Sequence, residues 1–312
     1  MDKISMNTSM ENRMIEASYQ ASWHPGTVPV AVVMIALNEG HNMEEVCQNL
    51  AGWAQEVFLV DSYSQDDTVD IALRYGVHVV QRRFRGFGDQ WNFALKELPI
   101  RAPWTMKLDP DERLSPELKD AISRLIQEAR CDGIAVVRRW WFMGKPLSIC
   151  DTVLRLWRTG TCRFSEVLVN EHPKVPGRIR MAEGFLEHLD SPDLEHWINK
   201  QNHYSTMEAI SFTRNLPLAE SPSLFGSALQ RRMWFKRHFR RIPFRYTLLF
   251  LYFWLWKGLW RSGWLGYASA RLWTMFYFVK ECKVREILAS GRLPQKRCYG
   301  LGDPDPRVAQ YE

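Results

Sequence analysis

Apolar residues gather in four short runs in the first third of the chain, and segments with helical spacing separate them. The nearly continuous run Val28–Leu37 and the shorter run Glu56–Val60 are typical of strands buried on both faces. The runs Val77–Val80 and Trp104–Leu108 complete the set. This alternation of strand and helix predicts an α/β domain whose sheet is mainly parallel and flanked by helices.

Two aspartates follow the fourth apolar run. Asp109 and Asp111 are separated by Pro110, which has no N–H and cannot continue a central strand. They are therefore expected on the loop at the carboxyl end of the strand, where open α/β sheets bind ligands. Two close carboxylates suit Mg²⁺ or Mn²⁺. The alternative is a solvated turn before a helix that begins near Ser115.

Polar residues also follow the first two predicted strands. Asn38 and Glu39 come after the first strand and Asp61 after the second, so both groups are expected to line one crevice with the aspartate pair. The basic, glycine-containing loop from Arg82 to Gly88 adds cations to the same rim. Such a crevice suits a nucleoside diphosphate. The alternative is that these are ordinary turn residues.

The C-terminal third has a different composition. The stretch Arg231–Arg241 places cations between aromatic residues, and Phe244–Trp260 and Trp264–Val279 are rich in Trp, Tyr and Phe. This composition is typical of helices that lie in a membrane interface, and the net charge of +6 favours anionic lipids. Two alternatives are a helical subdomain that packs on the sheet and a nucleic-acid site, although no nucleic-acid-binding fold accompanies the cations.

We therefore divide the chain into four parts. They are a flexible lead-in (1–27), an α/β domain (28–204), an amphipathic, aromatic helical region (205–290) and a poorly ordered tail (291–312). The lead-in has no apolar core typical of a signal peptide, and no apolar run reaches the length of a spanning helix. The six cysteines form no C-x-x-C pair, so we expect reduced thiols in a cytoplasmic protein.

Several polar motifs follow one another in a specific order. They are Ile35–Glu39, Val60–Ser62, Asp66–Thr68, Gly86–Gly88 with Asn92, Leu108–Glu112, Asp151–Trp157 and Val169–His172. This series resembles family-2 glycosyltransferases with a GT-A fold. It is most similar to the subgroup related to lipopolysaccharide inner-core glucosyltransferases, and the similarity spans roughly residues 28 to 204.

The resemblance implies a nucleotide-sugar donor, expected to be UDP-linked, and a metal cofactor, Mg²⁺ or Mn²⁺. It also implies an envelope glycolipid or polysaccharide precursor as acceptor, reached at the inner face of the cytoplasmic membrane. The donor would be held by Asn38, Glu39, Asp61, Arg85, Gly86, Asn92 and Asp109, and the metal by Asp109 and Asp111.

An inverting transferase needs a carboxylate that deprotonates the acceptor hydroxyl. The resemblance assigns this role to Glu171, expected after a short strand, Val167–Val169. The subgroup has His before this Glu, whereas here Asn170 precedes it and His172 follows. Asp151 is the alternative base. The Q-x-x-R-W motif of processive synthases is absent, which argues against a polymerising enzyme.

Two rival functions use the same features. A sugar nucleotidyltransferase would have a glycine-rich loop with lysine after the first strand, where this chain has Asn38 and Glu39. A catalytically inactive module would bind lipid or nucleic acid through its basic C-terminal part. The presence of Asp109, Asp111 and Glu171 argues against the inactive module.

Overall fold

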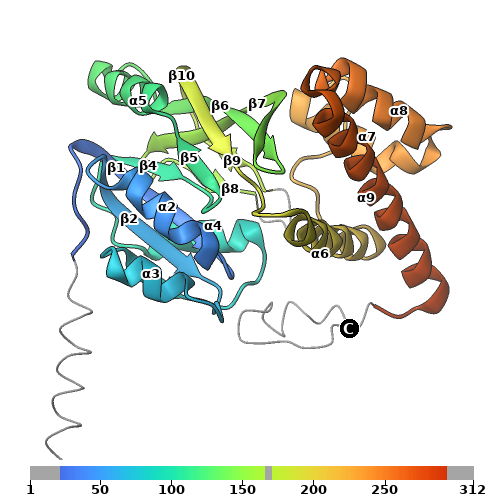
Figure 1. Cartoon of the computed structure of the whole chain (residues 1–312), viewed down its shortest axis with the longest axis horizontal. Helices are drawn as coiled ribbons and strands as arrows, with labels where there is room; N and C mark the ends of the chain where they lie inside the picture. Colours follow the sequence, from blue (N-terminus) through green and yellow to red (C-terminus); the bar gives the residue numbers. More distant parts are fainter. Residues whose placement is uncertain (1–21, 166–170, 294–312) are drawn as a thin grey trace, which may run out of the picture.

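An eight-stranded sheet forms the centre of the molecule in the computed structural model, which describes residues 22–165 and 171–293 (Figure 1). The strand order is β3-β2-β1-β4-β7-β6-β10-β5. The strands are β1 (Val28–Ala36), β2 (Ala54–Asp61), β3 (His78–Gln81), β4 (Trp104–Lys107), β5 (Glu112–Leu114), β6 (Gly133–Phe142), β7 (Lys145–Arg158) and β10 (Ile179–His188). A separate pair consists of β8 (Arg163–Phe164) and β9 (Pro173–Lys174).

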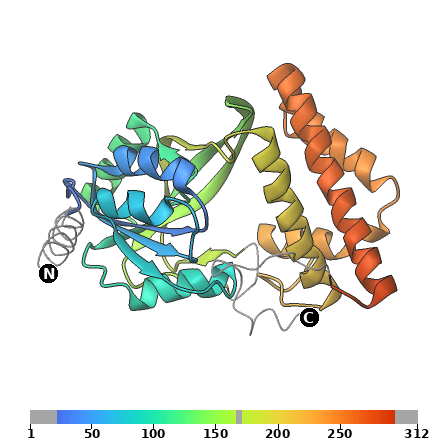
Figure 2. The same ribbon diagram turned by 60° about the horizontal axis from the view of Figure 1, so that its bottom comes forward.

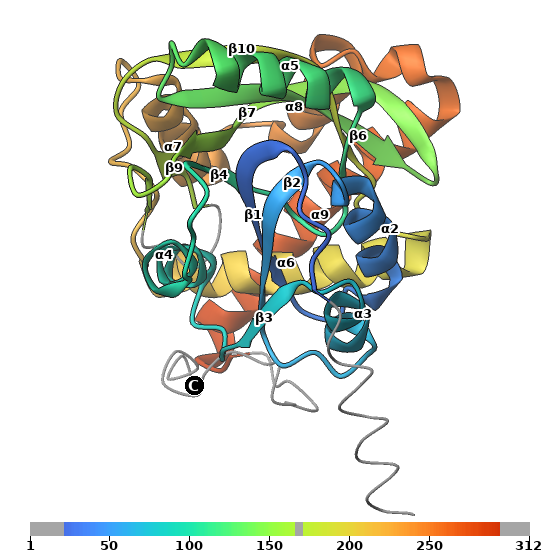
Figure 3. The same ribbon diagram turned by 90° about the vertical axis from the view of Figure 1, so that its left-hand side faces the viewer.

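Helices cover both faces of the sheet, which confirms the predicted α/β class (Figure 3). Apolar side chains of α2 (Gly40–Leu50), α3 (Thr68–Arg74) and α5 (Pro116–Glu128) enter the core on one face. Helix α4 (Phe87–Glu97) packs on the other face through Trp91 and Ala94. Gly76, with φ of +75°, follows α3 directly and lets the chain turn back into β3, as its position in the sequence predicts.

The sheet contains the predicted parallel part and also antiparallel strands, so it is mixed. Strands β1, β2, β3 and β4 pair in parallel, but β7 is antiparallel to both β4 and β6, and β5 is antiparallel to β10. The reversal comes from a tight hairpin between β6 and β7. Its two loop residues, Met143 and Gly144, have φ of +50° and +71°, as two-residue hairpin turns require.

A helical region follows the sheet (Figure 2). It contains α6 (Leu194–Thr213), α7 (Ala228–His238), η1 (Phe239–Arg241), α8 (Arg245–Leu251), the π-helical turn η2 (Tyr252–Trp256), η3 (Leu259–Ser262) and α9 (Gly263–Ser290). Helix α6 lies along α9 and begins at Leu194, within the part of the chain that we assign to the α/β domain from the sequence.

The helical region packs against the β6–β7 hairpin. Leu147 and Ile149 of β7 share one apolar cluster with Trp197 of α6 and with Leu259 and Ala270. Part of the aromatic sequence is therefore core, as one alternative predicts. Among residues 22–165 and 171–293, no helix has the length and apolarity needed to cross a membrane.

Candidate active site

The loops after β1 and β2 are tied together by their polar side chains. Asp61, at the end of β2, is fully buried and accepts hydrogen bonds from Ser64 N at 2.9 Å and Gln81 Nε2 at 3.0 Å. Asn38 is exposed, and its side chain accepts from Gln65 N at 2.8 Å, while its own N–H donates to Ser64 Oγ at 2.8 Å. These contacts fix both loops at the same edge of the sheet.

Glu39 lies deeper in the same edge. Its side chain is 18% exposed and accepts from Asn42 Nδ2 at 2.8 Å. Burial and the negative charge of Asp111 raise its pKa to about 7, against the opposing charge of Lys200. Glu39 therefore titrates near neutral pH, and it lies in the same electrostatic cluster as the aspartate pair.

Asp109 follows β4 and is held by the arginine of a distant strand. Arg155 of β7 donates to Asp109 Oδ2 at 3.1 Å and also to the fully buried Glu112. Burial alone would raise the pKa of Asp109, but the charges of Lys107 and Arg155 outweigh burial and lower it. Asp109 is thus an ionised carboxylate with a fixed orientation.

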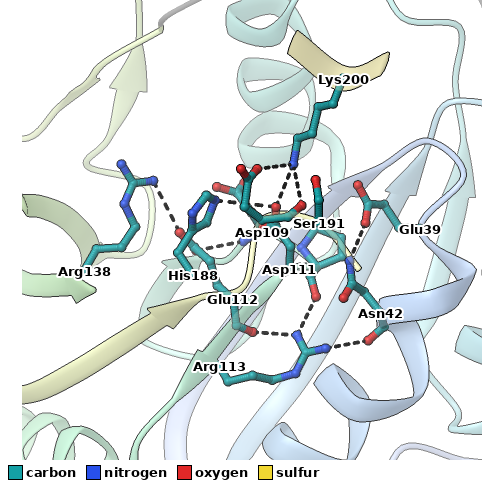
Figure 4. A network of polar contacts seen from close by, with 12 residues as sticks. Glu39, Asn42, Asp109, Asp111, Glu112, Arg113, Arg138, His188, Ser191 and Lys200 are labelled. Carbon is teal, nitrogen blue, oxygen red and sulfur yellow. Dashed lines mark hydrogen bonds and ion pairs between the residues drawn. The ribbon is translucent and has the colours of Figure 1, made fainter. Parts of the chain in front are cut away.

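Asp111 is the centre of a second group of polar side chains (Figure 4). Its Oδ2 lies 2.9 Å from Lys200 Nζ and 3.5 Å from His188 Nε2. Lys200 Nζ also lies 3.0 Å from Asp190 Oδ1. Asp111, His188 and Asp190 are all buried, and one ligand atom of each lies within 4.8 Å of the others. We call these three residues the acidic triad.

The acidic triad fits a divalent cation. Asp111 Oδ1 and His188 Nδ1 are buried and have no hydrogen-bond partner among the described residues. Unpartnered polar atoms of this kind are costly unless an ion or water completes their coordination. Carboxylate oxygens together with one imidazole form a donor set suited to a divalent metal.

The structure orients the two predicted base residues differently. Glu171 Oε1 binds Lys107 Nζ at 2.6 Å, and that ammonium lies 4.5 Å from the centre of the Trp91 ring. Asp151 accepts two hydrogen bonds from Arg138, at 3.1 and 2.9 Å, and one from Trp140 Nε1 at 3.0 Å. Burial opposes the shift, but these contacts lower the pKa of Asp151. The preceding segment Val167–Val169 and Asn170 lie outside the described residues.

Three of the residues predicted to hold the nucleotide-sugar donor lie at or near the start of α4. Arg85 is exposed and Gly86 is buried immediately before the helix. The side chain of Asn92 stabilises the fold: its Nδ2 donates to the backbone oxygen of Phe164 at 3.1 Å, and its Oδ1 accepts from Phe164 N at 2.9 Å. The contacts and electrostatic interactions thus group Glu39 with Asp109 and Asp111, whereas Asn92 is turned toward β8.

Sequence reasoning missed four residues of this cluster. Arg155 lies inside the segment Asp151–Trp157, and its pairing with Asp109 depends on the antiparallel placement of β7 beside β4. His188 is the last residue of β10 and Asp190 follows two positions later, so the signal in the sequence was a His-x-Asp at the end of a strand. Lys200 is one of several polar residues on α6, and nothing in the sequence distinguishes it.

The chain is similar to known glycosyltransferases. Residues 31–155 match the family Glycosyl transferase family 2. An uncharacterised glycosyltransferase of Rickettsia typhi is 24% identical over 280 residues, covering 84% of this chain and 89% of the relative. The lipopolysaccharide core biosynthesis glycosyltransferase LpsC of Rhizobium meliloti is 26% identical over 269 residues, covering 82% of this chain and 92% of LpsC.

Two solved structures show lower similarity. The mannosyltransferase PcManGT from Pyrobaculum calidifontis, in complex with GDP-Man and Mn²⁺, is 12% identical, with a TM-score of 0.47 over 88% of this chain and 94% of that chain. TarS of S. aureus is 16% identical, with a TM-score of 0.42 over 78% of this chain, and this chain spans only 54% of TarS.

The family match covers the strands that carry Asn38, Glu39, Asp61, Asp109 and Asp111, and extends to Arg155. The order of motifs, the α/β sheet and the named relatives agree with one another. The resemblance found in the sequence is therefore confirmed over residues 31–155, which match Glycosyl transferase family 2, and the relatives named above are glycosyltransferases.

Proposed function

We propose that this enzyme transfers a hexose from a UDP-sugar to a lipid-linked or cell-envelope glycan, with inversion at the anomeric carbon. The observation that carries the proposal is the cluster of polar side chains at the carboxyl ends of β1, β2 and β4, which combines the acidic triad with the buried Arg155. Lipopolysaccharide core synthesis, the role in the name of LpsC, is consistent with such an acceptor.

The donor is proposed to lie across the loops after β1 and β2. Asn38, Glu39 and Asp61 would contact uracil and ribose, because their loops are fixed at this edge by mutual hydrogen bonds. Arg85 and Gly86 would approach the diphosphate at the start of α4, with Asn92 supporting them from behind. Backbone N–H groups at a helix start favour such an anionic ligand.

The divalent cation, Mg²⁺ or Mn²⁺, is proposed to bind at the acidic triad. Asp111, His188 and Asp190 would hold it, and Asp109, two residues before Asp111 in the same loop, would lie beside it. The imidazole nitrogen favours Mn²⁺ over the harder Mg²⁺. When bound, the ion would neutralise the charge that develops on the leaving diphosphate.

Glu171 is proposed as the base that accepts the proton of the acceptor hydroxyl as its oxygen attacks the anomeric carbon. Lys107 holds this carboxylate through Oε1. Asp151 is the alternative. Its lowered pKa and its three hydrogen bonds from Arg138 and Trp140 make it the weaker base.

The direct test is UDP release from a panel of UDP-sugars with Mn²⁺, with Mg²⁺ and with EDTA. We expect metal-dependent release that Asp111→Asn reduces by at least a hundredfold and Glu171→Gln by a similar factor. Glu183→Gln changes an exposed carboxylate on β10 and serves as the matched control. Full activity of Glu171→Gln together with loss in Asp151→Asn would move the base to Asp151.

Other results of this assay would favour the rival functions. Release of pyrophosphate from UTP and a sugar phosphate would indicate a nucleotidyltransferase. No binding or turnover of any nucleotide sugar would favour an inactive module that binds lipid or nucleic acid. Each rival therefore predicts a result that differs from metal-dependent UDP release.

We further propose that the helical region binds the anionic surface of the cytoplasmic membrane from its inner face. Residues 221–280 contain eleven Lys and Arg and no Asp or Glu. Large aromatic side chains are exposed on the same segment: Phe244 at 83%, Trp256 at 84% and Trp264 at 69%. Exposed Trp and Phe beside cations suit a headgroup interface.

Vesicle sedimentation tests the membrane proposal. Wild type is expected to bind vesicles that contain phosphatidylglycerol and to release them at high salt, whereas Trp256→Ser/Trp264→Ser should bind at least tenfold more weakly. Leu37→Ser, an exposed apolar residue of the sheet region, is the control. Equal binding to neutral and anionic vesicles, or preferential binding to RNA, would contradict the proposal.

A further inference from the structure

Lys200 occupies the acidic triad with its own positive charge. The ammonium lies 2.9 Å from Asp111 Oδ2, 3.0 Å from Asp190 Oδ1 and 3.0 Å from the backbone oxygen of Asp190 (Figure 4). Both carboxylates are buried, with side chains 6% and 9% exposed. Two buried carboxylates at one point need a cation, and the chain supplies one from α6.

The neighbouring cations serve other carboxylates. Arg155 binds Asp109 and Glu112, while Arg138 binds Asp151 and lies 3.6 Å from Glu112. Arg113 donates to backbone oxygens of Pro110, Glu112 and Asn42. Lys200 is therefore the ion-pair partner that Asp111 and Asp190 share within the described part of the chain.

The oxygens that bind Lys200 are the ones that a divalent cation needs. A metal ion and an ammonium bound to the same two carboxylates would repel each other. Each cation would therefore weaken the attraction between the carboxylates and the other cation. The lysine side chain is flexible, and Lys200 is 19% exposed, so its ammonium has a route out of the triad. The two cations therefore compete for one site.

We propose that Lys200 is a built-in competitor that sets the divalent-cation affinity of the acidic triad. It keeps Asp111 and Asp190 paired when no metal is bound, and it lowers the affinity of the site for the metal. This inference rests on the proposed metal site, but it assigns to Lys200 a role that is separate from sugar transfer. Lys200 is a positioning residue in this scheme, because it acts through the carboxylates.

The test is Mn²⁺ affinity, measured by titration calorimetry and by the paramagnetic resonance signal of free Mn²⁺, without nucleotide. Lys200→Met is expected to bind Mn²⁺ at least tenfold more tightly than wild type, whereas Lys200→Arg keeps the charge and should stay within about threefold. Lys280→Met is the matched control, since Lys280 of α9 is also 19% exposed and its ammonium lies 2.9 Å from Glu208 of α6.

A thermal melt provides a second readout that does not depend on catalysis. Without metal, Lys200→Met should melt below wild type, because two carboxylates lose their partner. Saturating Mn²⁺ should then raise its melting temperature by more than it raises that of wild type. A Lys200→Met protein that folds, as judged by circular dichroism, and binds Mn²⁺ equally or more weakly would overturn the proposal.

The outcomes separate this inference from the proposed function. If neither wild type nor Lys200→Met binds Mn²⁺, the role of Lys200 is refuted, while UDP release still decides the transferase proposal. If only Lys200→Met binds Mn²⁺, competition by Lys200 is supported, and wild type would work without a tightly held metal. If Lys200→Met binds more tightly but no UDP-sugar is turned over, the inference stands and the proposed function fails.

Discussion

Replacing Arg155 by Met tests the electrostatic support of the site. The Arg155 side chain is 5% exposed and binds both Asp109 and the fully buried Glu112. Breaking a buried pair by removing one partner costs about 3–5 kcal/mol. Arg138, 3.6 Å from Glu112, remains and compensates in part, so we expect a loss near 3 kcal/mol at pH 8. Since whole domains are stable by only about 5–15 kcal/mol, this loss is large.

The loss should depend on pH. Burial already raises the pKa of Glu112 above its usual value of 4.5, despite the opposing charge of Arg155, and removing that charge raises it further. A raised folded-state pKa means that stability is full at low pH and falls as pH rises toward that pKa. Arg155→Met should therefore lose less stability at pH 5.5 than at pH 8, by about 1 kcal/mol or more.

Urea unfolding in EDTA, followed by circular dichroism at both pH values, measures these differences. Arg158→Met is the control on the same strand, because the Arg158 guanidinium stacks on the Trp104 ring, 4.3 Å from its centre. The double variant Arg155→Met/Glu112→Gln should regain part of the loss. Equal stabilities of Arg155→Met and Arg158→Met at both pH values would refute the reasoning.

Three further changes test other parts of the structure. The free energy of unfolding of wild type should fall by about 3 kcal/mol between pH 4.5 and 7, because the raised pKa of Glu39 favours its protonated form in the folded state. Glu39→Gln should abolish this fall, and urea titrations in EDTA at several pH values check it. Glu208→Gln should lower the free energy of unfolding by roughly 3 kcal/mol at pH 7, because Lys280 and Lys236 lower the pKa of Glu208 to about 2 against the effect of burial. In wild type the same stability should be lost as pH falls from 4.5 toward 2, and acid titration of the helical circular dichroism signal measures it. Asn92→Ala should lower the melting temperature, at a cost of about 1–2 kcal/mol, because the backbone of Phe164 loses two hydrogen bonds; calorimetry would contradict this if the melt were unchanged.

The parallel half of the fold was predictable because its signal is local. Val28–Leu37 and Glu56–Val60 are continuous apolar runs, and they form β1 and β2 with small shifts at their ends. The antiparallel half was not predictable in the same way, since pairing of β7 with both β4 and β6 depends on contacts between distant segments. The Met143–Gly144 turn shows why: its hairpin conformation depends on a non-glycine residue at positive φ.

The candidate site shows the same division. Strand-end residues such as Asp61, Asp109 and Asp111 can be found because a parallel strand places its next residues at one edge. Arg155 and Lys200 reach the cluster from β7 and α6, so only the three-dimensional arrangement shows what they bind. The proposed roles of Glu171 and Asp151 remain predictions, although their partners are now known.

Helix α6 gives the enzyme a fixed internal distance. Its 20 residues make a rod of roughly 30 Å, with Lys200 at the acidic triad and Glu208 paired to Lys236 of α7 and Lys280 of α9. Trp197 of the same helix packs in one apolar cluster with Leu259, which lies between Trp256 and Trp264 in the chain, so the acidic triad and the segment that carries these exposed Trp side chains are held on one helix. On the membrane proposed above, the enzyme would then glycosylate hydroxyls at one distance from the lipid, and the length of the existing glycan would select the acceptor.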